Sequence, residues 1–287
     1  MKLDFICVGM YRSGTTWFHS IMQNHPDVIL PYEKETMFFS HHYHRGIKWY
    51  AQFFKGLKSD SVAGEICPTY LTGPLAAKRI HAHFPDVKIL MILRDPVGQI
   101  TSLYKLWRTR GATTLDINEA FLEKENLIDN VMYYRNLRNY LDYFGGQQVK
   151  ILFYDDLVKN PEKFIAAICR ELTIDFSALE NENFNHRINT SDQSTLHAVE
   201  TFIAKASDYM RRNNLFRLRR LIKQTKIINF LKIIPPSKGT EPHQTVVLND
   251  HSMRLLCDRI LPEVENLQRL VNKDLSHWVT SLKCGKE

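Results

Sequence analysis

The fold of this chain is decided by the stretch Phe5-Ile6-Cys7-Val8-Gly9-Met10-Tyr11-Arg12-Ser13-Gly14-Thr15-Thr16-Trp17. The apolar run from Phe5 to Val8 predicts a buried strand. Small and hydroxyl-bearing residues follow with one cation, Arg12, and then helix-like apolar spacing begins. A strand, a small-residue loop and a helix N-terminus together present backbone N–H groups to a phosphate-like anion. We therefore expect an anion-binding loop, the alternative being a helix cap with a chance glycine.

The loop is similar to a P-loop but lacks its lysine. Gly9 and Gly14 have the Walker A spacing, yet Thr15 stands where that motif places lysine. Basic-Ser-Gly-Thr-Thr-Trp at the first strand–helix turn instead resembles the 5′-phosphosulfate loop of sulfotransferases that use 3′-phosphoadenylyl sulfate (PAPS). The resemblance implies that this nucleotide is bound by Arg12, Ser13, Gly14, Thr15, Thr16 and Trp17.

Composition and charge narrow the class of protein. The chain has 287 residues, of which 44% are apolar and 24% charged, as in ordinary globular proteins. Its net charge of +7 favours anionic partners, such as a nucleotide, an acidic glycan, nucleic acid or a membrane surface. Its 5 cysteines are dispersed, which argues against a disulfide scaffold or a zinc site and for a reducing compartment. We see neither a signal peptide nor a run of about 18 apolar residues, so we expect a cytoplasmic protein.

Apolar strand candidates alternate with amphipathic helix candidates along the chain. We expect strands at 4–8, 28–31, 62–66, 88–93 and 149–153. We expect helices at 14–23, 47–57, 74–83, 97–109, 131–144, 161–172 and 249–272, with Pro74 in the first turn of its helix. This alternation predicts an α/β, P-loop-like three-layer fold, with a central parallel sheet flanked by helices. We expect residues 1–287 to form a single domain that binds ligands at the carboxyl ends of its strands.

A less regular, basic and partly helical segment covers about 177–245. It contains no acidic residue between Asp208 and Glu241. For its most basic part, 211–232, three interpretations stay open: a solvated helix, a surface for an acidic substrate, and a contact with a membrane surface or nucleic acid. No motif for specific nucleic-acid binding is present, so we expect no specific nucleic-acid partner.

A second candidate anion site follows the predicted strand at 88–93. That strand ends in Leu93-Arg94-Asp95-Pro96, and the helix that follows carries Ser102. The planar fork of an arginine offers several donors in a fixed geometry, which suits an anionic ligand. The alternative is a local ion pair between Arg94 and Asp95.

This second segment also resembles the sulfotransferase family. Leu-Arg-Asp-Pro with a serine eight residues after the arginine resembles the family's 3′-phosphate-binding segment. The resemblance implies that Arg94 and Ser102 bind the 3′-phosphate. Ser237-Lys238-Gly239-Thr240 is similar to a late loop that closes over the same phosphate. Tyr154, in a Phe-Tyr-Asp-Asp segment, is expected near the adenine.

A candidate catalytic base follows the second predicted strand. Lys34-Glu35-Thr36-Met37-Phe38-Phe39 is similar to the segment that carries the catalytic carboxylate in heparan-sulfate-type sulfotransferases, and Gly64 to Tyr70 is similar to a later strand of theirs. This resemblance implies that Glu35 is the base. A carboxylate within hydrogen-bond reach can take the proton of an acceptor hydroxyl as the S–O bond forms. The alternatives are a surface salt bridge between Glu35 and Lys34, and Glu33 as the base.

The chain departs from the family pattern in two places. Glycan-type enzymes have lysine where Ile66 stands and usually where Arg12 stands. The small-molecule enzymes carry a histidine base in the later strand, and Ile66-Cys67-Pro68 offers none. These departures favour Glu35 as the base and give Arg12 a larger catalytic part beside the leaving phosphate.

The resemblance as a whole implies a sulfotransferase of the glycan and bacterial type. It would move a sulfuryl group from PAPS to a hydroxyl acceptor, expected to be a carbohydrate, glycan or glycolipid, and would release the desulfonated nucleotide PAP. We expect no metal requirement, and we interpret His41, His42 and His44 as substrate-cleft or surface residues. The alternatives are a P-loop kinase or NTPase, disfavoured by the missing lysine, and a non-catalytic nucleic-acid-binding module.

Overall fold

The computed structural model describes residues 1–54, 56–109, 111–180, 182–184, 210, 215 and 246–283. Within this part of the chain, five parallel strands form one sheet in the order β2-β3-β1-β4-β5. The strands are β1 (Phe5–Gly9), β2 (Val28–Ile29), β3 (Val62–Ile66), β4 (Lys88–Leu93) and β5 (Val149–Phe153).

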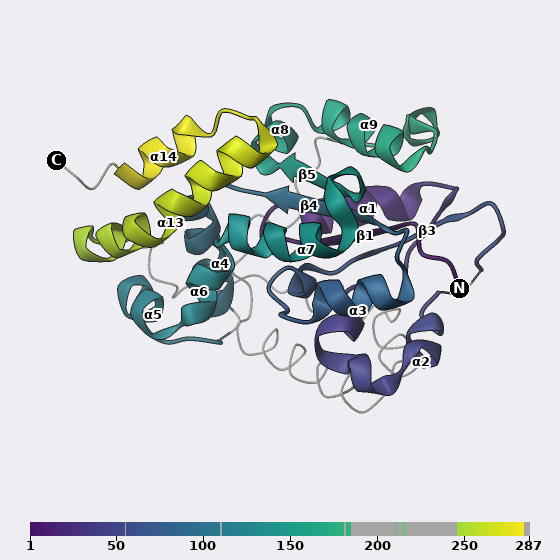
Figure 1. Cartoon of the computed structure of the whole chain (residues 1–287), viewed down its shortest axis with the longest axis horizontal. Helices are drawn as coiled ribbons and strands as arrows, with labels where there is room; N and C mark the ends of the chain where they lie inside the picture. Colours follow the sequence, from purple (N-terminus) through teal and green to yellow (C-terminus); the bar gives the residue numbers. More distant parts are fainter. Residues whose placement is uncertain are drawn as a thin grey trace, which may run out of the picture.

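Helices connect and flank the strands, as Figure 1 shows. They are α1 (Thr15–Asn24), α2 (Ile47–Ala51), α3 (Ala76–His83), α4 (Pro96–Thr109), α5 (Ile117–Glu123), α6 (Glu125–Asp129), α7 (Tyr133–Gln148), α8 (Tyr154–Lys159), α9 (Pro161–Leu172), α13 (Asp250–Val271) and α14 (Ser276–Lys283). A π-helical turn (Phe38–His42) follows the loop after β2.

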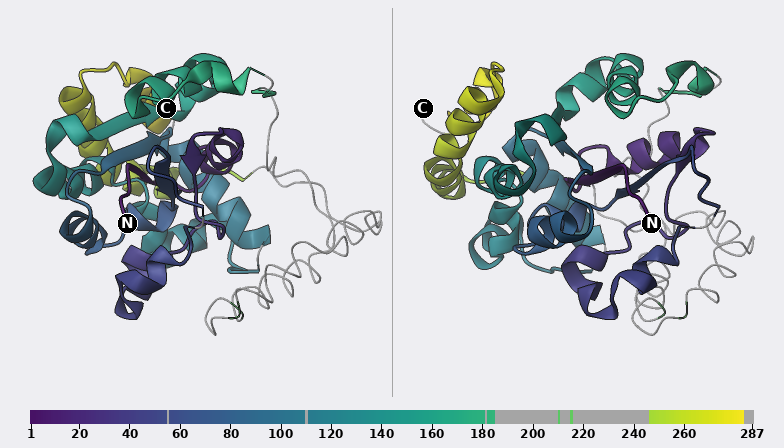
Figure 2. Two further views of the ribbon diagram at one scale, coloured as in Figure 1. Left: turned by 90° about the vertical axis from the view of Figure 1, so that its right-hand side faces the viewer. Right: turned by 45° about the vertical axis from the view of Figure 1, so that its right-hand side comes forward.

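Two hydrophobic clusters lie on opposite faces of the sheet, because successive side chains of a strand point to opposite sides. In β4, Ile89 and Met91 belong to one cluster, whereas Leu90 and Ile92 belong to the other. Residues of α3, α7 and α13 complete the first cluster, and residues of α1, α8 and α9 complete the second. Figure 2 shows these helices on the two sides of the sheet. The expected three-layer α/β fold with a central parallel sheet is therefore confirmed.

The expected elements and the observed ones agree closely, with three corrections. All five strands are present, although β2 is only two residues long. The helix expected at 47–57 ends at Ala51, because Phe53 and Phe54 turn into the core and the Phe53 carbonyl accepts from Tyr32 N–H at 3.0 Å. Pro74 lies outside α3, whose N-cap is Leu75.

Several short helices were not expected from the sequence. They include α5, α6, α8 and α14. The N-terminus of α5 has a local sequence signal that a search for apolar periodicity does not detect. This signal is a capping box, in which the side chains of Asp116 and Glu119 each accept a hydrogen bond from the other's backbone N–H. The single-domain organisation over 1–287 stays a prediction, and the basic segment at 211–232 lies outside the described residues apart from Leu215.

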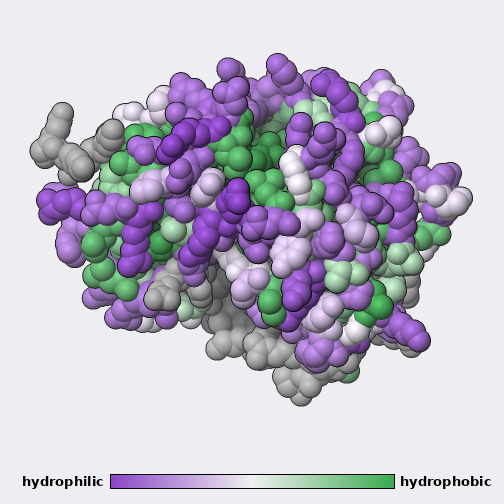
Figure 3. All heavy atoms as spheres, viewed as in Figure 1, coloured by the Kyte–Doolittle hydropathy of each residue, from purple (hydrophilic) through white to green (hydrophobic). Residues whose placement is uncertain are grey.

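The face of the molecule drawn in Figure 3 is mainly polar. On the face drawn in Figure 3, hydrophilic side chains predominate and hydrophobic ones form smaller areas between them. Among the helices that the structure describes, none combines the length and the apolar character that crossing a membrane requires.

Candidate nucleotide-binding and catalytic site

The loop between β1 and α1 has the backbone of an anion-binding turn. Arg12 and Gly14 have positive φ values of 64° and 84°. A Cβ on Gly14 would lie 2.4 Å from Leu157 Cδ2, because α8 packs directly against the loop. Only glycine satisfies both the conformation and the close approach. α1 begins at the next residue, Thr15, so its first N–H groups and the positive end of its dipole face this loop.

A buried glutamine holds the same loop in place. Gln99, in the first turns of α4, is 0% exposed. Its Nε2 donates to Tyr11 O at 2.5 Å, and its Oε1 accepts from Ser13 Oγ at 3.3 Å. Sequence reasoning missed Gln99, whose only signal is a polar residue at an inward-facing helical position. The loop conformation is therefore set partly by α4, the helix that also carries Ser102.

The two predicted anion clusters meet at one edge of the sheet. Arg12 Nε donates to Ser102 Oγ at 2.9 Å. Arg94 Nη1 donates to the backbone carbonyl of Arg12 at 2.9 Å. Because Arg94 follows β4 and Arg12 follows β1, and these strands are neighbours, two cations and a hydroxyl lie together at the carboxyl ends of adjacent parallel strands.

Aromatic residues fix the position of Arg94. Its guanidinium lies 4.6 Å from the ring centroid of Tyr154, and Tyr133 OH donates to its carbonyl at 2.6 Å. Among the described residues, Arg94 forms no ion pair with Asp95, whose carboxylate accepts instead from Ser281 Oγ and Gly98 N–H. The alternative of a local Arg94–Asp95 pair is therefore not what the structure shows. The structure places Tyr154 beside Arg94, whereas its expected contact with adenine stays a prediction.

Glu35 is linked to the first turn of α1, which follows the same loop, through its neighbour Lys34. Lys34 Nζ lies 3.6 Å from Glu35 Oε1 and donates to Thr16 Oγ1 at 2.9 Å. The two side chains are 25% and 20% exposed, so this ion pair is mostly buried rather than a surface one. The competitor Glu33 is buried, with 4% of its surface exposed. Glu35 is thus the more accessible carboxylate of the segment and is linked to the anion-binding loop.

The carboxylate of Glu65 binds the residue that follows Glu35. Glu65, in β3, is 0% exposed and accepts from the Thr36 N–H and hydroxyl and from the hydroxyls of Tyr50 and Tyr70. Burial raises the pKa of Glu65, and the hydrogen bonds from Thr36 and the tyrosines oppose that rise. Sequence reasoning passed over Glu65, because nothing in one strand indicates which loop its side chain will meet.

The other predicted site residues fall into three groups. Trp17 is buried against Phe164, and its Nε1 donates to Phe184 O at 3.1 Å, so its indole belongs to the core and its cofactor role stays a prediction. Lys238, Gly239 and Thr240 lie outside the described residues. His41 and His44 are exposed and His42 is partly buried. No group of side chains suited to a metal ion is found in the part of the chain that the structure describes.

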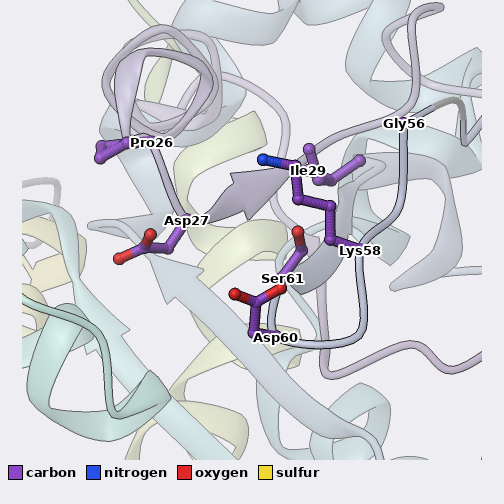
Figure 4. A pocket seen from close by; sticks show the side chains of 7 residues that line it. All are labelled: Pro26, Asp27, Ile29, Gly56, Lys58, Asp60 and Ser61. Carbon is purple, nitrogen blue, oxygen red and sulfur yellow. The ribbon is translucent and has the colours of Figure 1, made fainter.

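A pocket lies beside β2, an edge strand of the sheet, and does not include these residues. It is lined by residues around β2 and the loop that leads into β3, as Figure 4 shows: Pro26, Asp27, Ile29, Gly56, Lys58, Asp60 and Ser61. Ser61 directly precedes the first residue of β3, whereas the anion clusters follow the last residues of β1 and β4. This pocket is therefore separate from the site described above.

Comparison with known proteins agrees with the sulfotransferase resemblance seen in the sequence. Residues 2–220 match the family described as Sulfotransferase domain. The structure of a sulfotransferase from Alicyclobacillus acidocaldarius superposes with a TM-score of 0.65 at 21% identity, covering 97% of this chain and 99% of that one. At this identity the superposition is evidence for the fold alone.

Two curated relatives show the same likeness in sequence. The membrane-associated sulfotransferase kil1 of Dictyostelium discoideum is 35% identical over 104 residues, which cover 35% of this chain and 22% of the relative. Human heparan sulfate glucosamine 3-O-sulfotransferase 6 is 28% identical over 165 residues, covering 54% of this chain and 48% of the relative. The chain thus spans less than half the length of these two relatives.

Because the family match over residues 2–220 covers more than half of the sequence, the chain belongs to the sulfotransferase domain family.

Proposed function

We propose that this member of the sulfotransferase family transfers a sulfuryl group from PAPS to a hydroxyl of a carbohydrate, glycan or glycolipid acceptor. The observation that supports the proposal best is the meeting of Arg12, Arg94 and Ser102 at one edge of the sheet, with Glu35 linked to the same loop through Lys34. A nucleotide with phosphates at both its 5′ and 3′ positions needs two anion clusters close together. An ATP-dependent kinase needs a single phosphate track.

Each cluster has a part in binding the donor substrate. The backbone N–H groups and hydroxyls of residues 13–16 would bind the 5′-phosphosulfate, together with Arg12. Arg94 and Ser102 would bind the 3′-phosphate. Lys238, Gly239 and Thr240 would close over that phosphate, and Tyr154 would lie near the adenine.

The transfer needs a base and a stabilised leaving group. As the acceptor oxygen forms its bond to sulfur, its proton passes to Glu35, and the S–O bond to the 5′-phosphate breaks. Negative charge then develops on the phosphate, beside Arg12 and the N-terminus of α1. By analogy with phosphoryl transfer we expect a loose, in-line transition state. A sulfuryl group carries less negative charge than a phosphoryl group, so fixed donors suffice where a kinase uses magnesium.

The acceptor class rests on the similarity of the Glu35 segment and on the human relative named for heparan sulfate. A net charge of +7 is compatible with an acidic glycan. We further propose that the acceptor enters from the side of Glu35, which is the more exposed of the two carboxylates in the segment.

A ligand screen followed by two matched substitutions tests the proposal. PAP at about 100 times its dissociation constant should stabilise the protein by roughly 2.7 kcal/mol without magnesium, whereas ATP should not, and an oligonucleotide should act only at low salt. Glu35→Gln should lower kcat by about 10²–10⁴-fold and keep the PAP response. Glu33→Gln is the control in the same segment. Full turnover by Glu35→Gln, with activity lost in Glu33→Gln instead, would move the base to Glu33.

A further inference from the structure

The segment that carries Glu35 is fixed to the sheet by a carboxylate that the proposed reaction does not use. Glu65 lies in β3 and is 0% exposed. Its Oε1 accepts from the Thr36 backbone N–H at 3.0 Å and from Thr36 Oγ1 at 2.6 Å. The main chain and the side chain of Thr36 are therefore both bound to one oxygen of Glu65.

The second oxygen of Glu65 is held by two tyrosines. Its Oε2 accepts from Tyr50 OH at 2.7 Å and from Tyr70 OH at 3.0 Å. Burial raises the pKa of both tyrosines well above the ordinary value, so both hydroxyls keep their protons and donate. A buried carboxylate with four donors is rigid, because a shift of any partner leaves a buried polar group unsatisfied.

The backbone around Thr36 explains why such a restraint matters. Glu35 and Met37, on either side of Thr36, have φ values of 61° and 53°. Residues with a side chain rarely adopt this left-handed conformation, and it persists only where the surroundings hold it. Thr36 is the residue between the two, and its pair of bonds to Glu65 supplies the restraint.

On the assumption that Glu35 is the base, we propose that Glu65 is its positioning residue. Glu65 acts through Thr36, which it binds, and thereby holds Glu35 in the conformation that places its carboxylate beside Lys34 and Thr16. Glu65 itself takes no proton from the acceptor and does not touch the donor nucleotide. Its contribution is orientation, and a small misplacement of a base lowers the rate of the chemical step more than it weakens substrate binding.

Three substitutions separate this role from a general loss of stability. Thr36→Val removes the hydroxyl bond to Glu65 and keeps the shape of the side chain. Thr36→Ser keeps the hydroxyl and serves as the conservative rescue. Tyr104→Phe is the matched control, because its buried hydroxyl donates at 3.0 Å to the carbonyl of Leu115 and not to Glu65 or its partners.

The readout is the split between kcat and KM. Thr36→Val should lower kcat by about tenfold or more and leave the KM for PAPS and the thermal shift with PAP within about twofold. Thr36→Ser should recover most of the lost kcat, and Tyr104→Phe should keep the wild-type kcat. A rise in KM with unchanged kcat, or an equal loss in Tyr104→Phe, would overturn the proposal.

A double-mutant cycle shows whether the effect passes through Glu35. In a Glu35→Gln background, Thr36→Val should cause no further loss of residual turnover, because the group it positions is already gone. Equal losses in both backgrounds would contradict the positioning role and leave the base assignment intact. Wild-type activity of Glu35→Gln would instead overturn the base assignment itself, and the positioning role with it.

Hydrogen exchange gives a readout that does not depend on turnover. The Thr36 amide should be protected in the wild type, and Glu65→Gln should speed exchange across residues 32–39. Protection of residues 12–17 by PAP should persist in the same variant. Unchanged exchange at 32–39 would overturn the proposal even if transfer from PAPS is established. Absence of any PAP response in the wild type would count against the proposed function alone.

Discussion

Arg12 Nε donates a hydrogen bond to Ser102 Oγ at 2.9 Å, although the two residues are 90 positions apart in the sequence. This contact joins the loop after β1 to the helix after β4. The residues expected to bind the 5′ and 3′ ends of a nucleotide therefore lie side by side. A substitution in one cluster should also affect binding by the other.

Ser102→Ala should weaken PAP binding by roughly 10–100-fold. A hydrogen bond to a charged group contributes about 1.5–3 kcal/mol, and each 1.4 kcal/mol is tenfold in affinity. Titration calorimetry with PAP and with adenosine 5′-phosphosulfate measures this, and the loss should be larger for PAP, which alone carries the 3′-phosphate. Thr101→Ala is the control, because the Thr101 hydroxyl donates within its own helix. Equal losses for both nucleotides would contradict a 3′-phosphate contact.

Gly14→Ala should impair both folding and nucleotide binding. An alanine there adopts a left-handed conformation at a cost of about 1–2 kcal/mol and also collides with Leu157. Gly111→Ala isolates the conformational part, because Gly111 has a φ of 63° and, among the described residues other than its chain neighbours, no atom lies within 4 Å of an added Cβ. Urea unfolding should show a clearly larger loss for Gly14→Ala than for Gly111→Ala. Similar losses would mean that α8 does not pack against the loop as described.

Glu65→Gln should change how stability depends on pH. The pKa of Glu65 is raised in the folded state above 4.5, so the folded protein binds the proton more tightly than the unfolded chain does. Stability from this group is complete below about pH 4.5 and is lost as pH rises through the folded-state pKa. Urea unfolding at several pH values should show the stability of wild type, relative to Glu65→Gln, falling from pH 4.5 upward. A constant difference between the two proteins would contradict this.

The buried cysteines should resist alkylation in the folded protein. Burial raises the pKa of Cys7 to about 12 and that of Cys169 to about 11. At pH 8 roughly one thiol in 10³–10⁴ is then ionised, and the thiolate is the reactive form. Peptide mapping after iodoacetamide treatment should find both cysteines unmodified until urea is added. Rapid modification of Cys7 in the native protein would contradict its burial beside the anion-binding loop.

The sequence predicts the central strands β1 and β4 well, because both are buried on both faces and consist almost entirely of apolar residues. The run Ile89-Leu90-Met91-Ile92-Leu93 is an example, and its two faces pack in separate clusters. Short elements such as α8 escape prediction, because tertiary packing rather than local pattern stabilises them. The shortened α2 has the same cause, since Phe53 and Phe54 pack into the core instead of continuing the helix.

Site residues could be predicted where they lie in a short sequence motif typical of anion binding. Arg12, Arg94 and Ser102 follow strands in recognisable segments, and the structure brings them together. Gln99 and Glu65 could not be found in this way, because each acts on a loop far from it in sequence. A buried polar residue inside an apolar strand or helix is the one signal that both of them offer.

A crystal structure with bound PAP would show whether one nucleotide is held at both its phosphates. We expect the 5′-phosphate to lie against residues 12–16 and the 3′-phosphate against Arg94 and Ser102, with Glu35 on the side where the sulfuryl group would lie. A PAP molecule that contacts only one of the two clusters, or that binds elsewhere on the protein, would contradict this expectation.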